Sequence, residues 1–198
     1  MKEYIVKSQD SICWEKIEKA PIDTYKWVDT EYEPTCYAQV AVLSGKGLAV
    51  KMTAFETNPL AEKKNYNDAV CQDSCLEFFV SFDGSKKYFN IEMNSIGTCL
   101  ADLHETDGTT VQVKDIIGIP AITANKENGK WTVEFLLSFE DIDKLFPGVK
   151  IESGYSFRAN FYKCGDHTEK VHYGMWNEVT HPIPSFHQPD YFGKLIIE

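Results

Sequence analysis

Alternation of apolar and polar residues marks three segments of the chain, residues 76–80, 88–94 and 155–162. In the second segment Phe89, Ile91 and Met93 occupy every other position, and Asn90 and Glu92 lie between them. Successive side chains of a strand point to opposite faces of its sheet, so this pattern predicts strands with one apolar and one polar face. We expect the apolar faces to pack in a core and the polar faces to form one shallow outer surface.

Further strand-like runs lie at residues 36–43, 48–55, 97–103, 130–137, 171–176 and 192–197. Asp83, Gly84 and Ser85 separate two alternating runs and predict a hairpin turn. Ser138 with Asp141 at the capping-box position predicts a helix over residues 139–146. Residues 1–35 show no regular pattern and are expected to be irregular.

Many short strands with frequent turn signals and one helix predict an all-β fold. We expect an antiparallel β-sandwich, jelly-roll-like, with one short helix near residues 138–146. No internal repeat and no linker-like stretch interrupts the chain. The sequence therefore predicts a single domain over residues 1–198.

The charge and the apolar content of the chain indicate which kinds of binding partner to expect. The net charge is −10, with 30 acidic and 20 basic residues, which argues against binding nucleic acid or an anionic membrane surface. No apolar run approaches the roughly 20 residues that cross a bilayer. The first residues lack an apolar signal core, so we expect a cytoplasmic protein, or a secreted one if a signal segment has been removed. Six cysteines without a C-x-x-C pair are expected to be reduced thiols.

Several motifs follow one another along the chain, at residues 72–80, 88–94 with Gly97, 131–134, 158–162, Trp176 and 186–193. In this order they resemble the family 9 carbohydrate-binding modules from about residue 30 to the end. The resemblance implies a β-sandwich in which two tryptophans clamp a terminal sugar and polar residues bind its hydroxyls. Glu77 matches a family glutamate, and Phe186 falls at one clamp position. The other clamp position falls at Val70 or Cys71, neither of which is aromatic. Asn90 lies near a family arginine and does not reproduce it.

The predicted function is non-catalytic binding of a saccharide or a sugar-like small ligand. Aromatic rings stack on the apolar faces of sugars, and planar polar groups bind the hydroxyls. The predicted ligand-binding residues are Glu77, Asn90, Glu92, Arg158, Asn160, Tyr162, Trp176, Phe186 and His187.

Structural roles are the alternative for each of these residues. Trp176 can be a core tryptophan, Phe186 can pack under its loop, and His187 can fix that loop. Arg158 can pair with Glu77 or Glu92 across the strands. An outer strand face is also commonly polar without binding anything.

Two rival classes of function remain open. A glycoside hydrolase acting in carbohydrate catabolism, or part of one, would need two carboxylates, for which Glu77 and Glu92 are candidates. A haem-binding redox sandwich would need Met and His ligands, and the candidates are Met93, Met175, His172 and His187.

No cofactor is expected, although calcium is possible. Calcium takes six to eight oxygen ligands, and Asp102, Glu105 and Asp107 lie close together in the sequence. A zinc site is not indicated by the spacing of His and Cys residues. The sequence does not identify the sugar, its linkage or the oligomeric state.

Overall fold

A computed structural model describes all residues from Met1 to Glu198. Its strands are β1 (Glu3–Gln9), β2 (Ala20–Ile22), β3 (Thr24–Tyr25), β4 (Cys36–Leu43), β5 (Gly47–Ala54), β6 (Cys75–Ser81), β7 (Tyr88–Asn94), β8 (Cys99–His104), β9 (Thr110–Gln112), β10 (Thr123–Glu127), β11 (Lys130–Ser138), β12 (Ser156–Cys164), β13 (Tyr173–Met175) and β14 (Gly193–Ile197). The helices are α1 (Lys114–Ile117) and α2 (Phe139–Leu145), with 3-10 turns η1 (Trp14–Lys16), η2 (Val70–Gln72) and η3 (Pro189–Tyr191).

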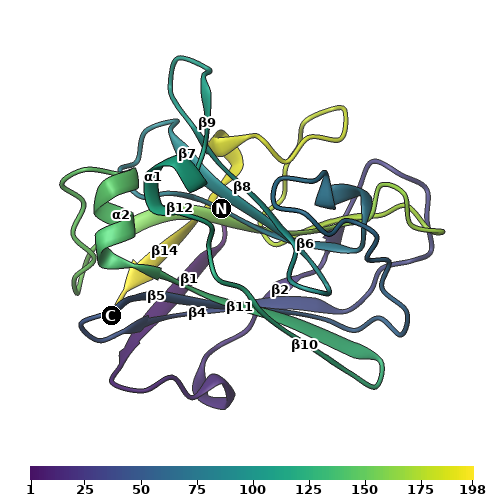
Figure 1. Ribbon diagram of the computed structural model, residues 1–198, viewed down its shortest axis with the longest axis horizontal. Helices are drawn as coiled ribbons and strands as arrows, with labels where there is room; N and C mark the ends of the chain where they lie inside the picture. The colour runs from purple at the N-terminus through teal and green to yellow at the C-terminus, as the bar shows by residue number, and fades with distance from the viewer.

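The strands form two facing layers, which confirms the predicted β-sandwich (Figure 1). One layer has the order β10-β11-β5-β4, and the other has the order β14-β12-β6-β7-β8-β9. The strand β1 lies between β4 and β14 and pairs with both in parallel, whereas the other strand pairs are antiparallel.

The prediction that residues 1–35 are irregular is wrong, because they contain β1, β2 and β3. Tyr4 and Val6 of β1 are buried, while Glu3, Ile5 and Lys7 are exposed. Its three apolar residues, Tyr4, Ile5 and Val6, are consecutive and show no alternation with polar residues. Its conformation is stabilised by hydrogen-bonded neighbours on both sides, which come from distant parts of the chain.

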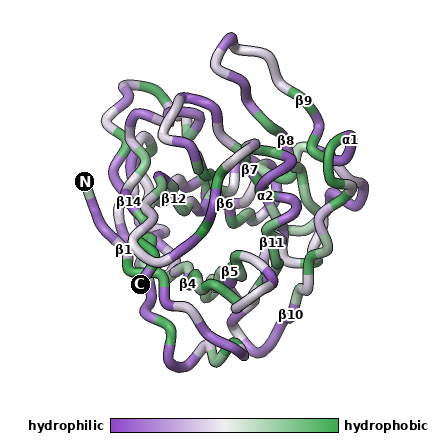
Figure 2. Tube along the Cα trace, turned by 90° about the vertical axis from the view of Figure 1, so that its left-hand side faces the viewer, coloured by the Kyte–Doolittle hydropathy of each residue, from purple (hydrophilic) through white to green (hydrophobic).

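Between the layers lies a core of 36 buried residues. Phe89, Ile91 and Met93 of β7 belong to it, as their alternation predicts. Phe78 of β6 stacks on Phe161 of β12, with ring centroids 5.4 Å apart. Each such side chain contributes roughly 1.5–3 kcal/mol by leaving water, so this core accounts for the main apolar stabilisation of the sandwich. Hydrophobic segments of β4, β5, β6 and β12 surround the space between the layers in Figure 2.

The opposite face of β6, β7 and β12 is also covered, which corrects the expectation of an open polar surface. Every residue of β6 and of β7 is buried. A second cluster of 10 buried residues lies on this face and includes Phe79, Tyr162 and Phe186. Its cover comes from Trp27 and from residues beyond β13, which lie far from these strands in the sequence. The polar side chains among these strands therefore lie in an enclosed region.

Local signals that depend on short-range geometry are confirmed. The Ser138 hydroxyl accepts a hydrogen bond from the Asp141 backbone N–H at 3.0 Å, so α2 begins where the capping pattern predicts. Gly84 has a φ of 72° in the turn between β6 and β7, a conformation that costs glycine little. The helix α1 was not predicted. All six cysteines are free, and neither α-helix is long and apolar enough to cross a membrane.

Candidate functional site

A cavity of about 200 Å³ opens on the covered face of β6, β7 and β12. Strands supply its floor, and the loop before η3 and the bend at Trp27 supply its walls. The residues that line it are Trp27, Cys71, Glu77, Glu92, Cys164, Asp166, Tyr173, Pro184, Ser185, Phe186 and His187. A volume of this size suits a single sugar ring or a comparably small ligand.

Two glutamates lie side by side on the floor. Glu77 of β6 is directly opposite Glu92 of β7 in the antiparallel register, and their side chains are only 2% and 5% exposed, respectively. Burial, and then the charge of Glu92, raises the pKa of Glu77 well above its ordinary value. Burial, and then Asp102, raises the pKa of Glu92 to about 7. Like charges directly opposite each other destabilise a sheet, so this pair has a cost to folding.

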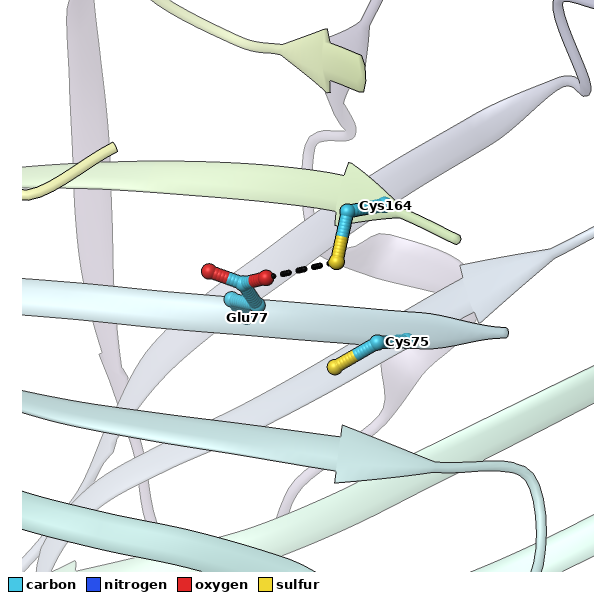
Figure 3. A group of neighbouring side chains, drawn as sticks. All are labelled: Cys75, Glu77 and Cys164. Atoms are coloured by element: carbon cyan, nitrogen blue, oxygen red, sulfur yellow. Dashed lines mark hydrogen bonds between the residues drawn. The ribbon is translucent and has the colours of Figure 1, made fainter. Parts of the chain in front are cut away.

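Glu77 also belongs to a small group with two thiols (Figure 3). The Cys164 thiol of β12 donates to Glu77 Oε1 at 2.9 Å. The ligand atoms of Cys75, Glu77 and Cys164 lie within 4.8 Å of one another. Such a set could hold a soft divalent cation after the thiols lose their protons. Burial raises the pKa of Cys75 to about 12, and the neighbouring Cys75, followed by burial, raises the pKa of Cys164 well above its ordinary value, so both thiols are protonated at neutral pH.

Three aromatic rings form the other wall of the cavity. Trp27 packs against Tyr173 with centroids 5.9 Å apart and planes at 70°. It packs against Phe186 at 5.5 Å and 49°. The Trp27 indole N–H donates to the His181 carbonyl at 2.7 Å, which fixes the ring over the loop. Phe186 itself stacks on Tyr162 beneath it, at 4.0 Å and 12°.

Behind Glu92 lies a chain of polar contacts. The Asn90 amide donates to Glu92 Oε1 at 3.1 Å, and the His104 Nε2–H donates to Asn90 Oδ1 at 2.9 Å. Burial lowers the pKa of His104. The Tyr88 hydroxyl and His187 Nδ1 share a hydrogen bond of 2.9 Å. These contacts orient the floor and hold His187 at the rim.

Four of the predicted ligand-binding residues line the cavity together, namely Glu77, Glu92, Phe186 and His187. Tyr162 and Asn90 lie one layer behind them, where they support Phe186 and Glu92. The structure thus places six of the predicted residues in or directly behind the cavity wall. That they bind a ligand stays a prediction.

The other three predicted residues lie elsewhere. Trp176 is 2% exposed and belongs to the core between the layers, so it offers no face for stacking. Asn160 is fully buried, and its amide donates to the Asn177 carbonyl at 2.8 Å. The expectation that Arg158 pairs with Glu77 or Glu92 is wrong, because its Nη2 donates to the carbonyl of Asp190 at 2.8 Å and its register partner in β6 is Ser81. All three have structural roles.

Trp27, Tyr173 and Asp166 line the cavity and were not predicted. No periodicity links them to the strands of the floor, because they lie in a bend, in the short strand β13 and in a turn. Val70 is buried in the second cluster, and Cys71 borders the cavity without a ring. Trp27 therefore supplies an aromatic wall from a segment that the sequence pattern did not connect with the site.

A second cavity of about 330 Å³ borders a buried ion pair. Lys163 Nζ lies 3.4 Å from Glu56 Oε2 and donates to His172 Nε2 at 2.7 Å. Burial, and then the charge of Lys163, lowers the pKa of His172 to about 4. Burial alone would raise the pKa of Glu56, but Lys163 and three hydrogen-bond donors hold it below its ordinary value. This network fastens β12 to the segment after β5.

The residues considered for other chemistry are dispersed. Met93 lies in the core between the layers, whereas Met175 lies in the second cluster, so they do not converge on one haem site. Each acid considered for calcium has a different partner. Asp102 accepts from Asn67, Glu105 pairs with Lys87, and Asp107 accepts from Thr109. Whether calcium binds stays a prediction.

Comparison with known proteins identifies a family whose model matches most of the chain. The model of the family described as carbohydrate-binding family 9 matches residues 7–197. No curated protein matches the sequence.

Solved structures have the same fold. A candidate carbohydrate-binding protein from Bacteroides uniformis superposes with a TM-score of 0.84 and 24% identity, covering 100% of this chain and 99% of that one. A family 9 carbohydrate-binding module from Caldicellulosiruptor kristjanssonii, in complex with cellotriose, gives 0.71 and 12%, covering 100% and 94%. That organism's module in complex with glucose gives 0.72 and 13%, covering 100% and 96%. At these identities the likeness establishes the fold.

Proposed function

The chain belongs to carbohydrate-binding family 9, and from this premise we propose that the cavity beside Trp27 and Phe186 binds a saccharide ring without cleaving it. The observation that supports the proposal is the placement of aromatic rings on one side of the cavity and carboxyl groups on the other. A pyranose has an apolar face and a rim of hydroxyls, so it needs both kinds of surface at once.

Each wall has a proposed role. Phe186 and Trp27 provide ring faces for the C–H side of the sugar, and Tyr162 supports Phe186 from below. Glu77 and Glu92 bind hydroxyls, and His187 closes the rim. Asn90 orients Glu92 through its amide. Asn160 and Arg158 act indirectly, since they fasten the backbone of the covering loops.

Binding without hydrolysis agrees with the electrostatics of the two glutamates. A glycosidase needs one protonated and one ionised carboxyl group. Here burial raises the pKa of both Glu77 and Glu92, and no lysine or arginine lines the cavity to keep one of them ionised as a nucleophile. Association with a glycoside hydrolase, a role in carbohydrate catabolism and a cytoplasmic location stay predictions from the sequence.

The test is isothermal calorimetry against a panel of monosaccharides and of β-linked and α-linked oligosaccharides. At least one saccharide should bind in the micromolar to millimolar range. Phe186→Leu, which keeps apolar bulk but removes the ring face, should weaken that binding by about two- to tenfold, since a stacking ring is worth roughly 0.5–1.5 kcal/mol beyond its area.

The matched control is Phe55→Leu, because Phe55 is 46% exposed and lies outside the cavity. This variant should bind like the unmodified protein. Failure of every saccharide to bind, with the protein folded by circular dichroism, would refute the proposal.

A further inference from the structure

We propose that this cavity prefers a saccharide that carries a protonated amine, an amino sugar, over a neutral one. This inference rests on the proposed function, because it names the class of sugar that the same site takes. It follows from the charge, the free hydrogen-bond acceptors and the ring geometry of the cavity.

The first observation is a group of acids without a cation among them. Three carboxyl groups line the cavity, those of Glu77, Glu92 and Asp166, and no lysine or arginine does. The nearest buried cation, Lys163, is held by Glu56 and donates to Ser74 and His172. Its attraction for Glu77 is weaker than the repulsion that Glu77 receives from Glu92 and from Asp166. Burial and this repulsion raise the pKa of Glu77 and of Glu92, and an ammonium group placed among the acids would relieve the repulsion, so the cavity favours a cationic ligand over a neutral one.

The histidines nearby do not change this balance. Burial lowers the pKa of His104, and burial together with the proximity of His104 lowers the pKa of His187. Both rings are therefore neutral at neutral pH. The cation that the cavity favours has to come from the ligand.

The second observation is a pair of carboxyl oxygens without a protein partner. Glu77 accepts only from the Cys164 thiol, through Oε1, and Glu92 accepts only from Asn90, also through Oε1. Both side chains are more than nine-tenths buried and line the cavity. Each glutamate therefore has a second carboxyl oxygen without a protein hydrogen-bond partner, on a side chain that lines the cavity. An ammonium group has three donors and no acceptor, so it can satisfy both.

The third observation is the arrangement of rings across from these acids. Trp27, Tyr173 and Phe186 stand at angles of 49° to 75° to one another, with centroids 5.5 to 6.1 Å apart. All three rings line the same cavity, so an ammonium group bound there has aromatic surface to contact, and such contacts attract a cation. A cation placed there meets rings on one side and carboxylates on the other. A pyranose without an amine can stack on the rings, but it brings no cation to the acids of the cavity.

The experiment compares glucosamine, N-acetylglucosamine and glucose by calorimetry at neutral pH and constant ionic strength. Glucose matches glucosamine in size and lacks its charge, and N-acetylglucosamine keeps the nitrogen without the charge but adds an acetyl group. Glucosamine should bind at least about tenfold more tightly than either neutral sugar, the factor that one charge-assisted hydrogen bond supplies.

Two glutamine variants test the source of this preference. Glu92→Gln keeps the shape of the floor and should reduce the ratio of the glucose Kd to the glucosamine Kd to within about twofold of unity. Glu77→Gln is a second test at the same site, should the first variant fold poorly. Glu140→Gln removes the same charge from the exposed helix α2 and should leave the ratio unchanged.

The outcomes separate the two proposals. Equal binding of glucosamine and glucose, or a preference for glucose, overturns the amino-sugar inference and leaves saccharide binding in place. A glucosamine preference that survives both Glu92→Gln and Glu77→Gln, or that Glu140→Gln also abolishes, overturns it as well, because the charge then acts from elsewhere. Absence of binding by all three sugars and by the wider panel overturns both proposals.

Discussion

Substitution of Glu92 by glutamine is expected to stabilise the unliganded protein at alkaline pH and to leave it almost unchanged in acid. Glu92 is 5% exposed, and burial, followed by Asp102, raises its pKa to about 7 in the folded state. In the unfolded chain the group has an ordinary pKa near 4.5. The folded protein therefore holds this proton more tightly than the unfolded chain.

The sign and size of the effect follow from linkage. Below the unfolded pKa both states are protonated, and the carboxyl group has its most favourable effect on stability. As pH rises from about 4.5 through about 7, that contribution is lost. The separation of roughly 2.5 pH units, at about 1.4 kcal/mol each, corresponds to about 3 kcal/mol. Glutamine keeps the hydrogen bond from Asn90 and does not titrate, so Glu92→Gln should recover up to this amount at pH 8.

The assay is urea unfolding followed by tryptophan fluorescence at pH 5 and at pH 8, with free energies from linear extrapolation. Glu140→Gln is the matched control, because Glu140 is exposed on α2 and pairs with Lys144. The difference between Glu92→Gln and the unmodified protein should grow by about 2–3 kcal/mol between the two pH values, and that of the control should stay within about 0.5 kcal/mol. A flat difference, or a variant less stable at pH 8, would refute the reasoning about Glu92.

Two further predictions concern stability away from the cavity. Lys163→Met should lower the free energy of unfolding by about 3–5 kcal/mol, because it leaves the Glu56 carboxylate buried without its cation. In urea unfolding, the double variant Lys163→Met with Glu56→Gln should recover part of this loss. Full stability of Lys163→Met alone would contradict the role of the ion pair. Gly193→Ala should destabilise by about 2 kcal/mol or more, because its Cβ would lie 2.3 Å from the Trp176 ring. The control is Gly45→Ala, where the added Cβ meets nothing within 4 Å and only the positive φ of 70° is strained. Equal melting temperatures for these two glycine variants would show that the Trp176 contact is not tight.

Much of the core could be predicted from the sequence because it depends on local alternation. Phe89, Ile91 and Met93 lie in the core at the positions that the period of two requires. The cap of α2 likewise involves Ser138 and Asp141, which are three residues apart. Both signals arise from backbone geometry within a few residues, and the sequence expresses that geometry directly.

The candidate site could be predicted only in part. Glu77, Glu92, Phe186 and His187 were expected there and do line one cavity. Trp176 was expected there and lies in the core, because alternation shows which residues share a face and does not show how that face is covered.

What the sequence determined by itself is most of the strands after residue 35, the apolar face of those that alternate, and the polar groups available on their other face. What only the tertiary structure decided is that this second face is enclosed. Trp27 and Tyr173 reach it from segments that pair with each other through β3 and β13, and Asp166 reaches it from a turn. Enclosure changes the chemistry, because the same carboxyl groups on an open strand face would keep ordinary pKa values and gain little from a cation. The physical reason for this difference is the distance along the chain over which each effect acts. Strand alternation is set by adjacent peptide units. Removal of water from a strand face depends on contacts between distant segments, such as that of Trp27 with Phe186.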